Sequence, residues 1–261
     1  MTRTSPRTNF HSSELIRCLS DLSLAEAADH GTAFAEKLGQ WIHFADAITL
    51  SAVHGEAIAG SPGQARPSSG AHGAACAAAI AEFDRIQGFL VNSITKSCSP
   101  DPASPAKKTH ISLPLPEPEP PQSIAAAYAP YRRFYEAHQR DMESSIQPLR
   151  VNLRSAVAKA SPRLRKLAEL DAMFEKILRE RETKLLSKVP LLLKARFEQL
   201  FKEHQQTLAD NGQADDPAGW IQPDAWLARF CSDMQMLLLA EMELRLQPAM
   251  GLIEAFRQDT Q

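Results

Sequence analysis

Residues 161–178, SPRLRKLAELDAMFEKIL, show the clearest helical pattern in the chain. Its apolar residues recur every three or four positions, as on one face of an α-helix: they are Leu164, Leu167, Leu170, Phe174, Ile177 and Leu178. Ser161 can cap the first amide groups, and Pro162 sits in the first turn, where its missing N–H costs no helical hydrogen bond. The stretch therefore predicts an amphipathic helix that starts directly after Ser161.

The same spacing continues beyond this helix on both sides. Upstream, Ser123 opens a long amphipathic stretch whose apolar line runs through residues 131–157. Downstream, the helix meets Pro190, where we expect a kink rather than a stop because the apolar pattern resumes at once. After a Gly- and Pro-containing break at residues 210–219, Asp224 is expected to cap a final helix.

The first half of the chain gives three further helices. The first should begin near Ser12 or Ser13, and the second should run from Thr32 to a stop at Gly55, with Ile48 in its buried apolar stripe. The third should span about residues 74–97. No segment shows the sustained period of two that a half-buried strand requires. The chain is therefore predicted to be all-α.

Two segments interrupt these helices. Residues 59–73 are rich in Gly, Pro and Ser, and residues 100–122 hold eight of the 18 prolines. Neither can bury enough apolar surface to offset its chain entropy, so both are predicted to be flexible linkers, the second extended and polyproline-like.

The linkers set the predicted domain organisation. We expect an N-terminal helical region, a flexible linker, a helix that packs on the N-terminal region, a Pro-rich linker and a C-terminal long-helix hairpin or bundle; their bounds are 1–58, 59–73, 74–99, 100–122 and 123–258. A helix of about 35 residues is about 50 Å long, so the C-terminal part should be elongated and resemble a coiled coil.

Composition excludes several classes of protein. The net charge is −2, and the longest apolar runs fall short of the roughly 18–20 residues that cross a bilayer. Residues 1–11 are polar and lack the apolar stretch of a secretory signal. We therefore expect a cytoplasmic protein without a transmembrane segment, whose four cysteines are reduced; Cys18, Cys76 and Cys231 should be buried and inert.

Motifs for catalysis or cofactor binding are missing from the sequence. There is no Cys-x-x-Cys or His-Glu-x-x-His zinc spacing, no glycine-rich phosphate loop and no Gly-x-Ser-x-Gly elbow. The eight histidines are scattered, and His138, beside the apolar stripe, is expected to pack at the edge of the core. We therefore predict no catalytic residue, no metal and no cofactor, and a protein that is not an enzyme.

The charge distribution is uneven. Residues 132–166 carry a net charge of +6, whereas residues 198–261 carry −7. Arg133, Arg140 and Arg154 are spaced by multiples of seven and share one helix face, which could bind phosphates or anionic lipid. Two alternatives stay open: the face packs near the acidic last helix, or it is simply solvated.

Arg181 is the other candidate interaction residue. It lies close to the apolar line between Ile177 and Leu185, where a basic side chain can set the register of helix packing or pair across an interface. An ordinary basic side chain that extends its charge to solvent is the alternative.

Several separated runs are informative when taken together: FAEKLGQW (34–41), DAITLSA (46–52), HQRDM (138–142), SPRLR (161–165), LAELD (167–171), RERE (179–182), RFEQL (196–200), WLARF (226–230) and LRLQP (244–248). In this order they resemble an uncharacterised proteobacterial family, a domain of unknown function. The resemblance covers most of the chain outside the linkers and implies no activity, cofactor or catalytic residue. It implies a partner in the cell envelope, since members of the family are often encoded beside outer-membrane-protein-A-like proteins.

These patterns favour a non-catalytic helical interaction or scaffold protein that works through self-association or a helical partner, as an accessory to a cell-envelope complex. The candidate interaction surface comprises Arg133, Arg140, Arg154 and Arg181. The alternative is a nucleic-acid-binding accessory protein that uses the basic face of residues 132–166.

Overall fold

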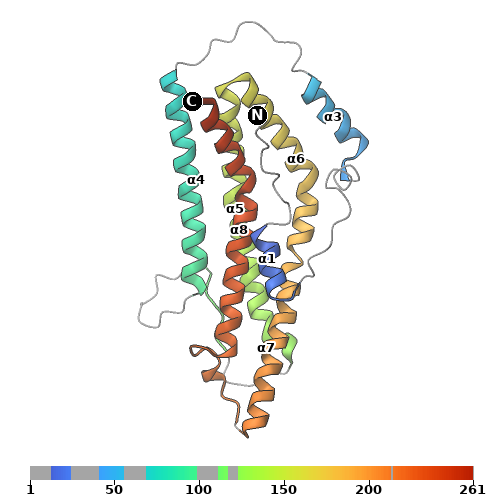
Figure 1. Cartoon of the computed structure of the whole chain (residues 1–261), viewed down its shortest axis with the longest axis vertical. Helices are drawn as coiled ribbons and strands as arrows, with labels where there is room; N and C mark the ends of the chain where they lie inside the picture. Colours follow the sequence, from blue (N-terminus) through green and yellow to red (C-terminus); the bar gives the residue numbers. More distant parts are fainter. Residues whose placement is uncertain are drawn as a thin grey trace, which may run out of the picture. The chain divides into compact units, whose positions relative to one another are not determined.

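The computed structural model describes residues 13–24, 41–55, 69–98, 111–116, 123–212 and 214–260, and all regular structure in these ranges is helical (Figure 1). The elements are α1 (Glu14–Asp21), α3 (Phe44–Gly55), α4 (Ser69–Cys98), α5 (Ile124–Ala160), α6 (Pro162–Leu186), α7 (Val189–Asn211), the short 3-10 helix η3 (Pro217–Gly219) and α8 (Trp226–Thr260). The prediction of an all-α protein is confirmed.

Side-chain caps explain where the two central helices begin. The Ser123 hydroxyl accepts a hydrogen bond from the Ala126 amide at 3.2 Å, just ahead of the 37-residue α5. The extended backbone of Ser161 lets its hydroxyl accept from the Leu164 amide at 3.3 Å, and Pro162 occupies the first turn of α6. Both starts agree with the sequence prediction.

At Pro190 the helix is interrupted, so the prediction of a simple kink was wrong. α6 ends at Leu186, two turn residues follow, and α7 starts at Val189. A proline at position 190 has no N–H for the Leu186 carbonyl, and its ring collides with that carbonyl in a continuous helix. The Leu186 carbonyl instead accepts a hydrogen bond from the Gln139 side chain at 3.0 Å.

Two other helix starts differ from the prediction. α4 begins at Ser69, so the last five residues of the predicted 59–73 linker are helical. Asp224 does not cap α8, because Ala225 is the residue directly before the helix and its carbonyl accepts from the Arg229 amide. The predicted start at Thr32, residues 59–68 and most of the Pro-rich segment lie outside the described residues.

The chain packs as two compact units. The first unit comprises residues 1–28, 94–138 and 190–244, and the second unit comprises residues 29–93, 139–189 and 245–261. Each unit therefore combines residues from before and after the Pro-rich segment.

An aromatic cluster fills the core of the first unit. Phe197 lies at its centre, with ring centroids 5.1 Å from Phe230, 5.2 Å from Trp226 and 5.6 Å from Tyr131. The contacts with Phe230 and Trp226 are edge-on, and such contacts add to the hydrophobic stabilisation from burial.

Two buried polar pairs cross the same core. The Tyr135 hydroxyl donates to the Glu241 carboxylate at 2.9 Å. His138 is 1% exposed, and its Nε2 lies 2.8 Å from the Ser97 hydroxyl, which itself donates to the Ile94 carbonyl. Because the single Ser97 proton is used on that carbonyl, His138 is the donor and carries its proton on Nε2.

Burial of His138 predicts acid-sensitive folding. Burial lowers the pKa of His138 to about 4 in the folded protein, whereas the same histidine titrates near 6.5 in the unfolded chain. Between these values the unfolded state binds a proton that the folded state does not. The free energy of unfolding should therefore fall by about 3 kcal/mol as the pH drops from 6.5 to 4.

Urea denaturation at several pH values measures this loss. His138→Gln should remove that part of the pH dependence because it has no proton to gain. An identical slope in the wild type and the variant would show that other groups cause the acid sensitivity.

Candidate functional site

The second unit contains a partly buried cluster of arginines and carboxylates. On α5, Arg150 and Arg154 are one turn apart; on α6, Asp171 and Glu175 are also one turn apart. Each pair occupies one face of its helix, so the two faces can meet as a square of alternating charge. The sequence missed this site because neither spacing indicates which helix the pair will face.

Each of the two arginines contacts both carboxylates. Arg150 Nη2 lies 2.9 Å from Asp171 Oδ1, and its Nη1 lies 3.9 Å from Glu175 Oε1. Arg154 Nη1 lies 3.0 Å from Asp171 Oδ2 and also pairs with Glu175. The four side chains are only 10–15% exposed, so each charge depends on its partners rather than on water.

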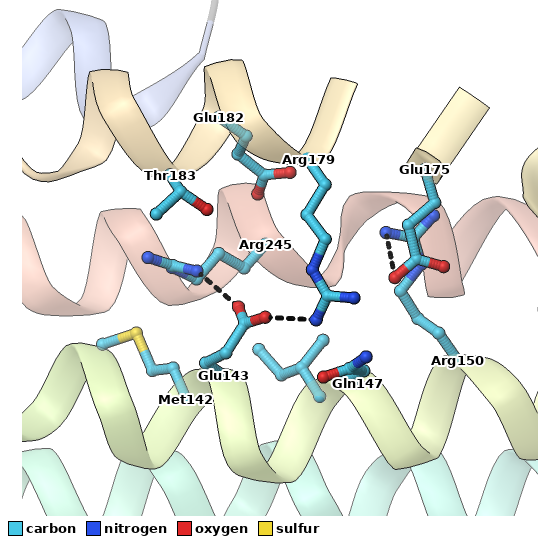
Figure 2. A pocket seen from close by; sticks show the side chains of 10 residues that line it. Met142, Glu143, Gln147, Arg150, Glu175, Arg179, Glu182, Thr183 and Arg245 are labelled. Carbon is cyan, nitrogen blue, oxygen red and sulfur yellow. Dashed lines mark hydrogen bonds and ion pairs between the residues drawn. The ribbon is translucent and has the colours of Figure 1, made fainter. Parts of the chain in front are cut away.

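Glu143 extends the cluster to a third helix. Its carboxylate accepts from Arg179 of α6 at 2.8 Å and from Arg245 of α8 at 3.2 Å, and Figure 2 shows it between these two guanidinium groups. Arg245 is 10% exposed, whereas Glu143 and Arg179 are nearly half exposed. One glutamate thus links α5, α6 and α8.

A small cavity of about 30 Å³ lies within this cluster. Arg150 lines it and has a buried Nε with no hydrogen-bond partner in the described part of the chain. Burial raises the pKa of Glu182, which also lines the cavity, and Arg245 and Arg150 offset part of the increase. The volume is that of about one water molecule, which could accept from Arg150 Nε. It is too small for an organic substrate.

Two larger grooves lie elsewhere. In the first unit, α1 and α8 border a groove of about 540 Å³ that includes Glu14, Cys18 and Glu243. Burial, followed by the charge of Asp21, raises the pKa of Cys18, so its thiol stays protonated and is a poor nucleophile. In the second unit, α6 and α8 border a groove of about 270 Å³ whose lining combines three leucines of α6 with charged and polar side chains of both helices.

All four cysteines are buried and free. Burial raises the pKa of Cys98 to about 11 and that of Cys231 to about 12, which suppresses thiolate chemistry at neutral pH. Across the described ranges, no group of three or more His, Cys, Asp or Glu side chains could hold a metal ion. None of the helices in these ranges is long and apolar enough to cross a membrane.

The structure separates the four arginines predicted to form an interaction surface. Arg133 and Arg140 are exposed on α5. Arg154 belongs to the charge square, and Arg181 donates to the Trp41 carbonyl at 3.1 Å while its guanidinium lies 5.4 Å from the centre of the Trp41 ring. The charge of Arg154 is therefore balanced by carboxylates of the same chain. Arg181 connects α6 to Trp41, which lies just before α3.

Helix α3 presents an apolar surface that sequence reasoning did not single out. α3 packs against α6, where Asp46 and Leu50 are half-buried (Figure 1). On its opposite side Phe44 is 83% exposed and Ile48, one turn later, is 55% exposed. The sequence predicted Ile48 to lie in the buried stripe of a helix from Thr32, and its exposure corrects that assignment.

The family model of proteins of unknown function designated DUF3348 matches residues 1–258. The chain belongs to this family. The match includes nearly all of both units and brings no activity with it. Neither a curated protein nor a solved structure matches the chain.

The charge square predicts strong coupling between α5 and α6. In a double-mutant cycle, Arg154→Gln and Glu175→Gln should show a coupling energy of about 1–3 kcal/mol, because each single change leaves a partly buried charge with one of its two partners removed. Denaturant unfolding of the four proteins gives the value.

Arg85 and Glu82 provide the matched control. They form an ion pair on α4 at 2.7 Å but are 63% and 39% exposed, so solvent screens them and their coupling should be much smaller. Equal coupling energies in the two cycles would contradict the claim that the partly buried square couples α5 and α6 more strongly than an exposed ion pair couples its two residues.

Proposed function

We propose that this protein is a non-catalytic helical interaction protein whose contact surface is the outward face of α3. The observation that carries the proposal is the exposure of Phe44, at 83%, together with that of Ile48 on the next turn. Large apolar side chains grouped on a soluble surface usually mark a contact site. Arg181 and Trp41 supply the fastening that keeps this surface on α6.

The chemistry of the charge cluster supports a structural role for it. Its guanidinium groups are permanently charged, its carboxylates are paired with them, and its cavity has the volume of about one water molecule. The nucleic-acid alternative stays a prediction: Arg133 and Arg140 are exposed, but Arg132, Arg150 and Arg154 are ion-paired within the chain. The cell-envelope partner and the cytoplasmic location also stay predictions.

Introducing charge on α3 tests the proposal. The double variant Phe44→Glu/Ile48→Glu should fold normally, because both side chains are exposed in the wild-type chain. It should nevertheless lose self-association or the binding of its partner protein. Sedimentation of the purified protein and identification of the proteins that co-purify from the native host measure this loss. The control is Val151→Glu/Met250→Glu, which adds the same charge at exposed apolar positions of the second unit outside α3. Retention of every assembly by the α3 variant would refute the proposal.

Arg181→Glu tests the fastening of α3. It removes a hydrogen bond and a cation–π contact, together about 1–2 kcal/mol, and should weaken assembly roughly tenfold without unfolding the chain. Arg140→Glu makes the same charge change at an exposed position of α5 and should have little effect. Similar losses in both variants would point to net charge rather than to the Trp41 contact.

A further inference from the structure

Among the side chains of α3 that the structure describes, those of residues 44 and 46–52, none on the outward face is charged. Phe44, Ala47, Ile48, Ser51 and Ala52 are all exposed and lie within one side of the helix, at spacings of three, four, seven and eight residues. Asp46 is half-buried and lies on the opposite side of the helix from Phe44. Charged groups of a partner at this face would lose their hydration without gaining a counter-charge, so the complementary surface is expected to be uncharged as well.

A second copy of α3 meets this requirement. When two identical faces meet about a twofold axis, no like charges are brought together. The face is bulky at the Phe44 end and small at the Ser51 and Ala52 end. In an antiparallel pair centred on Ile48, each Phe44 falls opposite the partner's Ala52, and the two Ile48 side chains meet at the axis. In a parallel pair the two Phe44 rings would collide while the small ends left a gap.

The size of the face sets the strength of such a pair. α3 has 12 residues and is about 18 Å long, so two of its faces cover well below the roughly 1,200 Å² of a stable complex. The contact should be weak, reversible and dependent on protein concentration.

We propose that the outward face of α3 pairs with the same face of a second copy of this chain, the two helices running antiparallel. This inference rests on the proposed function, because it names the occupant of the same surface.

Cysteine cross-linking tests the pairing, and the chain is suited to it because its own four thiols are buried. Ile48→Cys, at the axis, should form a disulfide-linked dimer when the full-length protein is oxidised with diamide. Phe44→Cys alone should cross-link far less, whereas a mixture of Phe44→Cys and Ala52→Cys proteins should give a mixed dimer. Val151→Cys places a thiol at a comparably exposed apolar position of α5 and reports random collisions.

Failure of Ile48→Cys to cross-link above the Val151→Cys level would overturn the inference. So would stronger dimerisation of Phe44→Cys than of Ile48→Cys, because that result requires a parallel pair. The proposed function is tested separately: if cross-linking fails but Phe44→Glu/Ile48→Glu still loses a co-purifying protein, the surface is functional and its occupant is a different chain. If both fail, the surface has no partner.

Discussion

The second unit depends on the charge square formed by Arg150, Arg154, Asp171 and Glu175. Four partly buried charges are tolerated only because each lies against two of the opposite sign. If α6 slid by one turn along α5, one arginine and one carboxylate would lose their partners in a poorly solvated place. Apolar stripes alone would permit such a slip, so the square fixes the register that leucine packing leaves open.

Two sides of helix α6 make different contacts, one with α5 and one with Trp41. Arg179 and Glu175 point toward α5, whereas Arg181, two residues after Arg179, points toward Trp41. Residues two apart on a helix project in nearly opposite directions. The helix that the square holds in place is therefore the same helix that holds α3, and its register decides where the apolar face of α3 is presented.

Much of the fold was readable from the sequence, because caps and apolar spacing are local signals. Ser161 with Pro162 marked the start of α6, and Ser123 marked the start of α5. The break at Pro190 was harder to predict. The sequence shows a proline within an apolar pattern, but it does not show that the Gln139 side chain donates a hydrogen bond to the Leu186 carbonyl. This hydrogen bond satisfies a carbonyl that a continuous helix would have paired with the amide of residue 190.

The site was less predictable, because it depends on which helices meet. Arg154 shares a face with Arg133 and Arg140 on a helical wheel, yet Asp171 and Glu175 compensate it from another helix. The i,i+4 spacings of Arg150 with Arg154 and of Asp171 with Glu175 were the available signal, and they identify the partners only once α5 and α6 are known to be adjacent. The exposure of Phe44 had no signal in sequence, since an apolar residue on a helix is usually buried.

The central claim is that the charge square fixes α6 against α5, and that α6 in turn holds α3 with its apolar face available for pairing. Hydrogen exchange of the wild-type chain tests this claim without substitutions. Mass spectrometry should compare residues 44–55 of α3 with residues 171–182 of α6 at low and high protein concentration. The account predicts that the α3 amides exchange more slowly at high concentration, while the α6 amides are strongly protected at both. Exchange of α3 that does not change with concentration, or α6 amides as unprotected as those of α3, would contradict it.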